Sequence, residues 1–428
     1  MLNEERASSR AIRRSHNRST SLRKAVAMSL VGIICLLSGL VQPVDARTVV
    51  STDGASGDLP SQPIETMQVV SMPTDLNELM DSIGVVGLPG PSEPGSFTTV
   101  INPGATLSLP AYADALAAFD RAAAQWSAFI SDPITVNIDA DFAPLDTNVI
   151  GSTDSVMLQG GFNEVRDEMV ADAADETDDG IVAFLPTHTQ FRALVPTGDN
   201  GEPDFTLADA IVATKANFKA LGFADLDTEF GTSDGVITFS TNFNFDFDNS
   251  DGIDPGTMDF ETVAAHEIGH VLGFISMVDT VDYLLDEGSI GDIGPSTLDM
   301  FSFLDGLTEL DPSNPSEFTT FPRLLTPGFD RIIDQIDPAG GSDAEIPLSE
   351  GFFSGDGRQA SHWKDNNITG TLIGMMDPTL ANGQLFAITD SDIRALDLIG
   401  YDIAVPEPTT LILFAAGAMA VIRRRRRK

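Results

Sequence analysis

The sequence contains a single cysteine, Cys35, in 428 residues. It lies in an apolar run, residues 25–40, that follows seven Lys and Arg among the first 24 residues. A basic leader, an apolar run too short for a comfortable membrane span and small residues at 44–46 are typical of a signal peptide at 1–46, removed after Ala46. An uncleaved signal anchor is the alternative. The exported chain would contain no cysteine, which excludes a disulfide framework and a cysteine-based latency switch.

Basic residues are also scarce. The chain has 24 Lys and Arg against 64 Asp and Glu, a net charge of −40, and more than half of the basic residues lie in the leader or in the terminal Arg-Arg-Arg-Arg-Arg-Lys. So acidic a chain argues strongly against nucleic acid as a partner. Solubility in a salty or crowded exterior, Ca²⁺ binding, or both would explain the excess of carboxylates.

Long hydrophobic runs occur only near the two ends. At the C-terminus, Pro406, Glu407 and Pro408 precede an apolar run, residues 411–422, and then the terminal basic cluster. Positive charge after an apolar segment is a stop-transfer arrangement. The three parts in this order resemble the PEP-CTERM sorting signal, which exosortases process in Gram-negative bacteria. The resemblance implies export to the cell envelope or beyond, an exosortase-type partner and transient membrane association through residues 405–428; a plain tail anchor is the alternative.

The organisation between the ends follows from composition and periodicity. Residues 47–96 are rich in Pro, Gly and Ser without steady periodicity, so we expect a linker or propeptide. A candidate strand at 96–104, a helical pattern at 112–130 and an alternating strand at 133–143 then open a mixed α/β domain expected to span residues 97–404. A second alternating stretch, residues 234–248, precedes the main motif.

The strongest chemical signal is H-E-x-x-H at His266, Glu267 and His270. Asp259 is placed to cap a helix there, and Gly273 to end it. Histidines four apart on a helix project from one face and can share a Zn²⁺ ion at about 2.0–2.1 Å. Glu267 sits beside the metal without ligating it, so it can act as general base toward a zinc-bound water and later protonate the leaving amine.

The third ligand is not evident from the motif. Ser276 stands where a metzincin would place its third histidine. Of the five histidines in the chain, one lies in the leader, two lie in the motif, and His188 and His362 remain. One of these two, or a carboxylate, must complete the site. Neither Glu287 nor Glu309 has the Asp four residues on that a gluzincin ligand usually has, and His188 lies in a polar loop where we expect exposure.

A family resemblance decides between these options. His362 is followed fourteen residues later by Met376 in a Met-Asp-Pro turn, and then by a helical pattern at 389–402. In this the sequence resembles the metzincins, and within them the leishmanolysin-like group, whose third histidine is displaced by a large insertion. Carried across, the resemblance implies the ligands His266, His270 and His362, the base Glu267, the turn glycine Gly273 and the methionine beneath the metal, Met376, or Met375 if the register is one off.

The resemblance also implies a fold. It predicts a mixed α+β domain with a twisted sheet and an active-site helix, followed by a smaller C-terminal subdomain that carries the Met-turn. Residues 277–361 match nothing in the family and must fold as an excursion that returns His362 to the motif helix. The disulfides usual in leishmanolysins are absent, which leaves the peptide preference open.

A second possible ion site precedes the motif. The stretch D-F-D-N-S-D-G-I-D-P-G-T-M-D resembles a calcium loop but fails the EF-hand register, because Gly252 falls one place late. A Ca²⁺ site and a turn with exposed acids are both compatible with its carboxylates, Asp246, Asp248, Asp251, Asp254 and Asp259.

Two functions compete. The leading hypothesis is a secreted zinc endopeptidase that cleaves protein or peptide substrates. The alternative is a non-catalytic zinc-containing surface or adhesion protein of the cell envelope. The intact Glu267 favours the enzyme, because a purely structural zinc site does not need a base.

Overall fold

The computed structural model describes residues 65–69, 84–85, 96–175, 180–196, 205–289, 291–306, 310–333 and 345–403. The predicted signal peptide, 1–46, and the sorting segment, 405–428, lie outside the described residues. Of the predicted linker or propeptide, 47–96, the structure describes chiefly two short strands, β1 (Glu65–Val69) and β2 (Gly84–Val85). Composition did not predict either strand.

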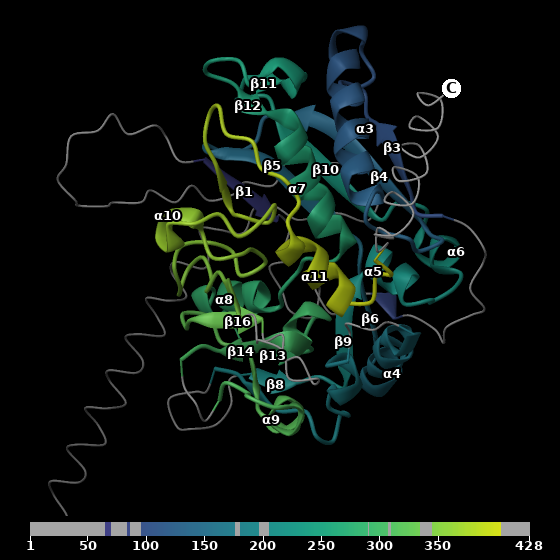
Figure 1. The fold of residues 1–428 in the computed structure, drawn as a ribbon, viewed down its shortest axis with the longest axis vertical. Coiled ribbons are helices and arrows are strands. Elements are labelled where there is room, and N and C mark those ends of the chain that lie inside the picture. Colours follow the sequence, from purple (N-terminus) through teal and green to yellow (C-terminus); the bar gives the residue numbers. More distant parts are fainter. Residues whose placement is uncertain are drawn as a thin grey trace, which may run out of the picture.

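The largest sheet has six strands in the order β18-β1-β5-β10-β4-β3 (Figure 1). Strands β3, β4 and β10 run parallel, β5 is antiparallel to β10, β1 is parallel to β5, and β18 is antiparallel to β1. Their bounds are Thr98–Pro103 for β3, Thr135–Ala143 for β4, Val149–Ser155 for β5, Gly235–Ser240 for β10 and Thr379–Leu380 for β18. The predicted strands near 96–104 and 133–143 are therefore confirmed.

Two helices, α3 (Ala113–Ser127) and α7 (Phe260–Leu272), pack against each other and against this sheet. Helix α3 confirms the pattern predicted at 112–130. The Trp126 indole N–H donates to the carbonyl of Ala265 at 2.8 Å, which ties the two helices together. Aromatic rings fill the space beneath them, with Phe239 and Phe260 4.5 Å apart between centroids. The motif helix is thus held in the main core.

The single alternating strand predicted over 234–248 is wrong in extent. Strand β10 ends at Ser240, and Thr241 closes its end by donating to the carbonyl of Ala143. The chain then turns into a loop whose short strand β11 (Phe245–Asp246) pairs with β12 (Met258–Asp259). Alternation continued in the sequence because the phenylalanines of this loop pack against the core.

Smaller elements surround the main sheet. A second sheet has the order β2-β6-β9, a third β14-β16-β17, and the pairs β13-β8 and β15-β7 complete the set. The bounds of these strands are Met157–Gly161 (β6), Ala193–Leu194 (β7), Phe205–Leu207 (β8), Ala210–Thr214 (β9), Gly291–Ile293 (β13), Ser302–Leu304 (β14), Arg323–Leu324 (β15), Arg331–Ile333 (β16) and Ile346–Leu348 (β17). The other helices are Phe162–Asp172 (α4), Lys215–Ala220 (α5), Leu226–Phe230 (α6), Val278–Asp286 (α8), Pro315–Thr320 (α9), Asn366–Thr369 (α10) and Asp390–Leu398 (α11).

The described part of the stretch 277–361 includes α8 through β17 and packs on the rest of the domain. Val278, Val281 and Leu325 form a small apolar cluster together with Phe205 and Val212, whereas Phe303 and Leu348 belong to the main core. The chain then returns to the end of α7. Helix α11, which begins with a capping box at Thr389 and Asp392, confirms the helical pattern predicted at 389–402.

Candidate metal centre

Helix α7 presents the motif because its ends are fixed by specific residues. The Asp259 carboxylate accepts from the N–H of Thr262 at 2.9 Å and caps the N-terminus. Gly273 ends the helix at φ +120°, a conformation that L side chains rarely adopt. All residues of the helix between these ends are buried. The motif side chains therefore have little freedom to move.

Three histidines converge at one point. The Nε2 atoms of His266 and His270 lie 3.1 Å apart, and His362 Nε2 lies 3.2 Å from that of His266 and 3.3 Å from that of His270. Among the described residues, this is the group of three or more His, Cys, Asp or Glu side chains with metal-ligand spacing. The excursion thus returns His362 to the motif helix, as the prediction requires.

The far nitrogens of the three rings fix their orientation. Nδ1 of His266 faces the Met375 carbonyl at 2.9 Å, that of His270 the Phe274 carbonyl at 2.9 Å, and that of His362 the Gln359 carbonyl at 3.2 Å. A carbonyl only accepts, so each Nδ1 carries the proton and each Nε2 turns a lone pair toward the other two. This is the tautomer that metal-binding histidines adopt.

Burial keeps these rings neutral. It lowers the pKa of His266 to about 4, and the pKa values of His270 and His362 well below the usual value for histidine. Neutral imidazole is the form that binds a metal.

The fit to zinc can be tested on the distances. In a tetrahedral site with Zn–N bonds of about 2.0–2.1 Å, neighbouring ligand atoms lie about 3.3–3.4 Å apart. The three Nε2 separations, 3.1 to 3.3 Å, are close to that distance between ligand atoms. Three buried lone pairs this close repel one another unless a cation lies among them. The residues present therefore fit a metal ion with nitrogen ligands.

Glu267 lies beside the histidines without joining them. Its Oε2 accepts from the Thr153 hydroxyl at 2.6 Å, while its Oε1 has no hydrogen-bond partner in the described part of the chain. Burial raises its pKa to about 8, and the Thr153 hydrogen bond opposes that rise. A buried carboxyl with one oxygen anchored and one unpaired is suited to exchange a proton with a group near the histidines.

The excursion is attached to the site by buried carboxylates. Asp279, on α8, accepts from the backbone N–H groups of Ala360 and Ser361 at 2.6 and 2.9 Å and from the Ser361 hydroxyl at 2.5 Å. Ser276, in place of a histidine, donates to Asp299 at 2.6 Å, and its own N–H donates to Ser361 Oγ at 2.9 Å. Both residues thus hold the segment immediately before His362.

The methionines occupy distinct places under the site. A Cβ on Gly269, between the two motif histidines, would lie 2.3 Å from Met376 Sδ, so that side chain packs directly against α7. Met375 instead offers its carbonyl to His266. The Met376 side chain therefore packs on α7 at Gly269, whereas Met375 contacts His266 through its backbone carbonyl.

The remaining candidates lie elsewhere. His188 is partly exposed, and its Nδ1 lies 3.2 Å from Asp209. Glu287 is exposed, and Glu309 lies outside the described residues. Sequence reasoning missed Thr153 and Asp279, because nothing in the local sequence shows which hydroxyl or carboxylate will reach the site.

Comparison with known proteins concerns the end of the chain. Residues 404–427 match the PEP-CTERM protein-sorting motif. No curated protein and no solved structure matches the chain. The PEP-CTERM motif marks an exported protein that is sorted to the cell surface, and it makes an exosortase a plausible partner. Within the described residues, no helix has the length and apolarity to cross a membrane.

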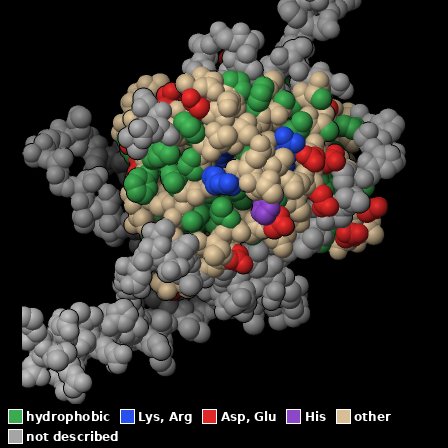
Figure 2. Space-filling model, turned by 90° about the horizontal axis from the view of Figure 1, so that it is seen from below, with side chains coloured by type: hydrophobic (Ala, Val, Ile, Leu, Met, Phe, Trp, Pro, Cys, Tyr) green, Lys and Arg blue, Asp and Glu red, His purple; other side chains and the backbone are tan. Residues whose placement is uncertain are grey.

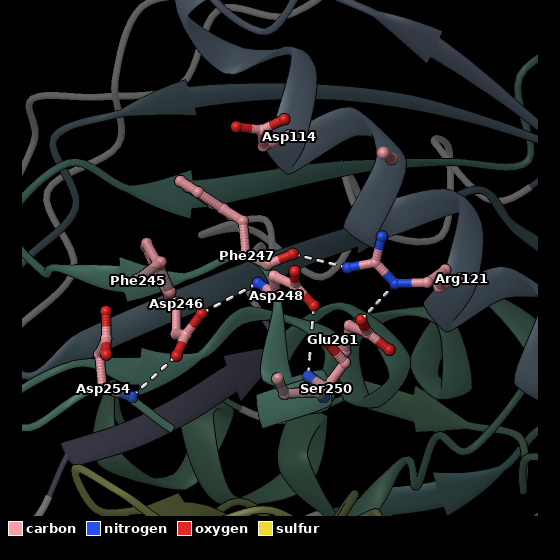
Figure 3. Close-up of a pocket in the computed structure, with 11 residues that line it drawn as sticks. Asp114, Arg121, Phe245, Asp246, Phe247, Asp248, Ser250, Asp254 and Glu261 are labelled. Atoms are coloured by element: carbon pink, nitrogen blue, oxygen red, sulfur yellow. Dashed lines mark hydrogen bonds and ion pairs between the residues drawn. The ribbon is translucent and has the colours of Figure 1, made fainter. Parts of the chain in front are cut away.

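The acidic loop before α7 does not gather its carboxylates around one point. Figure 3 shows that Asp246 instead accepts from the N–H groups of Asp248 and Asp254, at 2.9 and 2.8 Å. Arg121 reaches into the same pocket and bonds to Glu261 at 2.5 Å. These contacts are those of a turn whose acids bond their own backbone, so the calcium expectation gains no support from the described geometry.

The surface agrees with the low basic content. Basic side chains do not gather into a patch on the face shown in Figure 2, where acidic and hydrophobic groups are interspersed.

Proposed function

We propose that this exported chain is a zinc-dependent endopeptidase with a metzincin-like core that resembles the leishmanolysin-like group. The observation that carries the proposal is the convergence of three Nε2 lone pairs at 3.1–3.3 Å beside a carboxylate that is not one of the ligands. A structural zinc site needs its ligands, but it does not need a carboxylate such as Glu267 that lies outside the ligand set.

The roles of the residues follow from their positions. His266, His270 and His362 would hold the zinc ion, which when bound would polarise a peptide carbonyl and acidify a water. Glu267 would take the proton of an attacking water on its unpaired Oε1 and deliver it to the leaving amine. Thr153 holds the other carboxyl oxygen, so Oε1 is the oxygen left to take a proton.

A non-catalytic zinc-containing surface protein is the competing function. The sorting motif is compatible with both, since it concerns the destination of the chain and not its chemistry. Glu267 separates them: burying a carboxyl with an unpaired oxygen costs about 1–3 kcal/mol of stability, and a binding protein gains nothing in return.

The test compares Glu267→Gln with the unchanged chain. The substitution should leave close to one zinc per chain and abolish chelator-sensitive casein hydrolysis, because it removes the base and keeps the ligands. Both proteins are assayed before and after limited cleavage by a glutamyl endopeptidase, since the predicted propeptide contains Glu65 and Glu78. Equal hydrolysis by the two proteins, or none by either after cleavage, would refute the enzymatic function.

A further inference from the structure

The last residues that the structure describes are tied to the core of the domain. The Ser131 N–H donates to the Asp402 carbonyl at 2.8 Å, and the Ser131 hydroxyl donates to the same oxygen at 3.2 Å. Ile130 and Ile403 form an antiparallel bridge beside this contact. The set of residues 130–132 and 399–403 is called the C-terminal clasp below.

Two buried contacts hold the clasp from the inside. Tyr401 has no exposed surface, and its hydroxyl donates at 2.7 Å to the carbonyl of Leu272, at the end of α7. The Asn217 side chain, on α5, donates to the Ile399 carbonyl at 2.8 Å. The sorting motif begins at residue 404, directly after the clasp. The clasp therefore fixes the point at which that motif leaves the domain.

Three carboxylates lie at the clasp. Asp132 follows Ser131 and is only 2% exposed, and its Oδ2 has no hydrogen-bond partner in the described part of the chain. Asp402 belongs to the clasp itself. Asp172, the last residue of α4, lies next to the returning chain, since a Cβ on Gly400 would be 3.4 Å from its Oδ2.

The surroundings of Asp132 favour its neutral form. Burial, together with the charges of Asp402 and Asp172, raises the pKa of Asp132 to about 8, and hydrogen bonds from the backbone of Asp132 and Asp402 oppose the rise. Tyr401 stays neutral beside it, because burial and the charges of Asp132 and Asp234 raise the pKa of its hydroxyl well above the usual value.

The lysines on the neighbouring helix α5 are paired with other acids. Lys215 and Lys219 both form ion pairs with Asp227 and with Asp234, at 2.7 to 3.4 Å. Their charges are therefore taken up at the start of β10 and in α6. A proton on Asp132 is then the simplest way to limit the negative charge at the clasp.

We propose that the C-terminal clasp is a proton-dependent latch on the root of the sorting segment, closed while Asp132 carries a proton and opened when it ionises. An ionised Asp132 adds a negative charge beside Asp402 and Asp172 at a position that is closed to water. Opening moves this charge into solvent and separates it from the other two. The proposal does not depend on the enzymatic function.

The latch bears on how the tail is processed. In the closed clasp, residues 404 and 405 separate the paired chain from Pro406. Opening adds residues 399–403 to the free chain before that proline. Enzymes that cut a folded protein act on its locally opened form. The latch therefore makes processing of the sorting segment faster as the pH rises.

The sign of the pH dependence follows from proton uptake. The pKa of Asp132 is about 8 in the closed clasp and returns toward its ordinary value of 3.8 when the clasp opens. Closing therefore binds a proton between these two values, and the closed state is progressively lost as the pH rises through that window. One proton gives a change of up to about tenfold in the opening equilibrium for each pH unit.

Hydrogen exchange on the unchanged full chain tests the latch. The Ser131 amide, which donates to Asp402, reports closure. After correction for the intrinsic exchange rate, its protection should fall by up to about 100-fold between about pH 5.5 and 7.5 and level off above about pH 8. The amides of β4 in the same sample serve as the reference for pH effects elsewhere. Protection of Ser131 that follows that of β4 at every pH would overturn the proposal.

Two variants assign the effect to one carboxyl. Asp132→Asn imitates the protonated acid, so Ser131 protection should change by no more than about threefold over the same pH range. The control Asp402→Asn removes a neighbouring charge and keeps Asp132, so the pH dependence should remain while protection near neutral pH increases. An Asp132→Asn chain with the unchanged slope would overturn the proposal, as would an unchanged chain whose slope disappears when CaCl₂ is added, since a metal ion would then balance the charge.

Discussion

Replacing Asp279 by asparagine should weaken zinc binding although Asp279 is not a ligand. Its carboxylate accepts from two backbone N–H groups and one hydroxyl in the segment that ends at His362. Asparagine has one acceptor oxygen, so its NH₂ group must face at least one of these buried donors. The position of His362 then loses its support from α8.

The magnitude follows from those contacts. Leaving one buried donor unpaired costs about 1–3 kcal/mol of stability. Part of this loss of stability is offset. Burial raises the pKa of Asp279 to about 6, which shows that its charged form is costly to bury, and the neutral amide avoids that cost. Zinc affinity should fall about 10–100-fold, as is usual when the support of a ligand is lost.

The matched control lies three residues further along the same helix. Asp282 is also buried and accepts from the N–H groups of Phe353 and Ser354, at 2.7 and 3.0 Å, in a loop that holds no zinc ligand. Zinc affinity is measured by chelator competition and stability by thermal unfolding. Asp282→Asn should lower stability and leave zinc affinity unchanged within about threefold. Equal zinc affinities for the two variants would refute the positioning role of Asp279.

Three further predictions concern other parts of the chain. Gly269→Ala should destabilise the protein by about 1–3 kcal/mol through overlap with Met376, and the same substitution should cost less in a Met376→Ala background; a thermal unfolding cycle in which the two effects simply add would contradict this packing. In metal-free protein the pKa of His266, lowered to about 4 by burial, means that the unfolded chain binds more protons between pH 6.5 and 4. Stability should therefore fall as the pH drops through that window, by up to about 1.4 kcal/mol per pH unit for this group, and a His266→Ala chain with the same slope would exclude this origin. Deleting residues 406–428 should release the protein into the medium, and identical fractionation of the two forms would contradict the sorting role of the tail.

The parts of the fold that the sequence predicted are those whose pattern is local. Helix α3 and strand β4 have one buried face, and the periods of their apolar residues show it. Helix α7 is buried on all sides, so its bounds came instead from its cap, Asp259, and its terminal Gly273. His362 was accessible to reasoning because histidine is rare in this chain and a methionine turn follows it.

The parts that could not be predicted depend on contacts between distant segments. Strand β1 has partners more than 80 and more than 300 residues away, and its five residues are too short a run to indicate which strands they pair with. In the sequence, Asp279 does not differ from other acidic residues on an amphipathic helix. Its role depends on its contacts with residues 360 and 361, which only the fold shows. Ser276 illustrates the same limit, since only the fold shows that it binds the returning chain and not a metal.

The central claim is that His362 completes a zinc site with His266 and His270, and zinc affinity of two alanine variants tests it most directly. His362→Ala removes one of three nitrogens that lie within 3.3 Å of one another, so zinc affinity should fall by orders of magnitude and peptidase activity should be lost. His188→Ala removes a partly exposed imidazole paired with Asp209, and zinc affinity should change by no more than a few-fold. A His362→Ala chain that binds zinc as tightly as the His188→Ala chain would contradict the account.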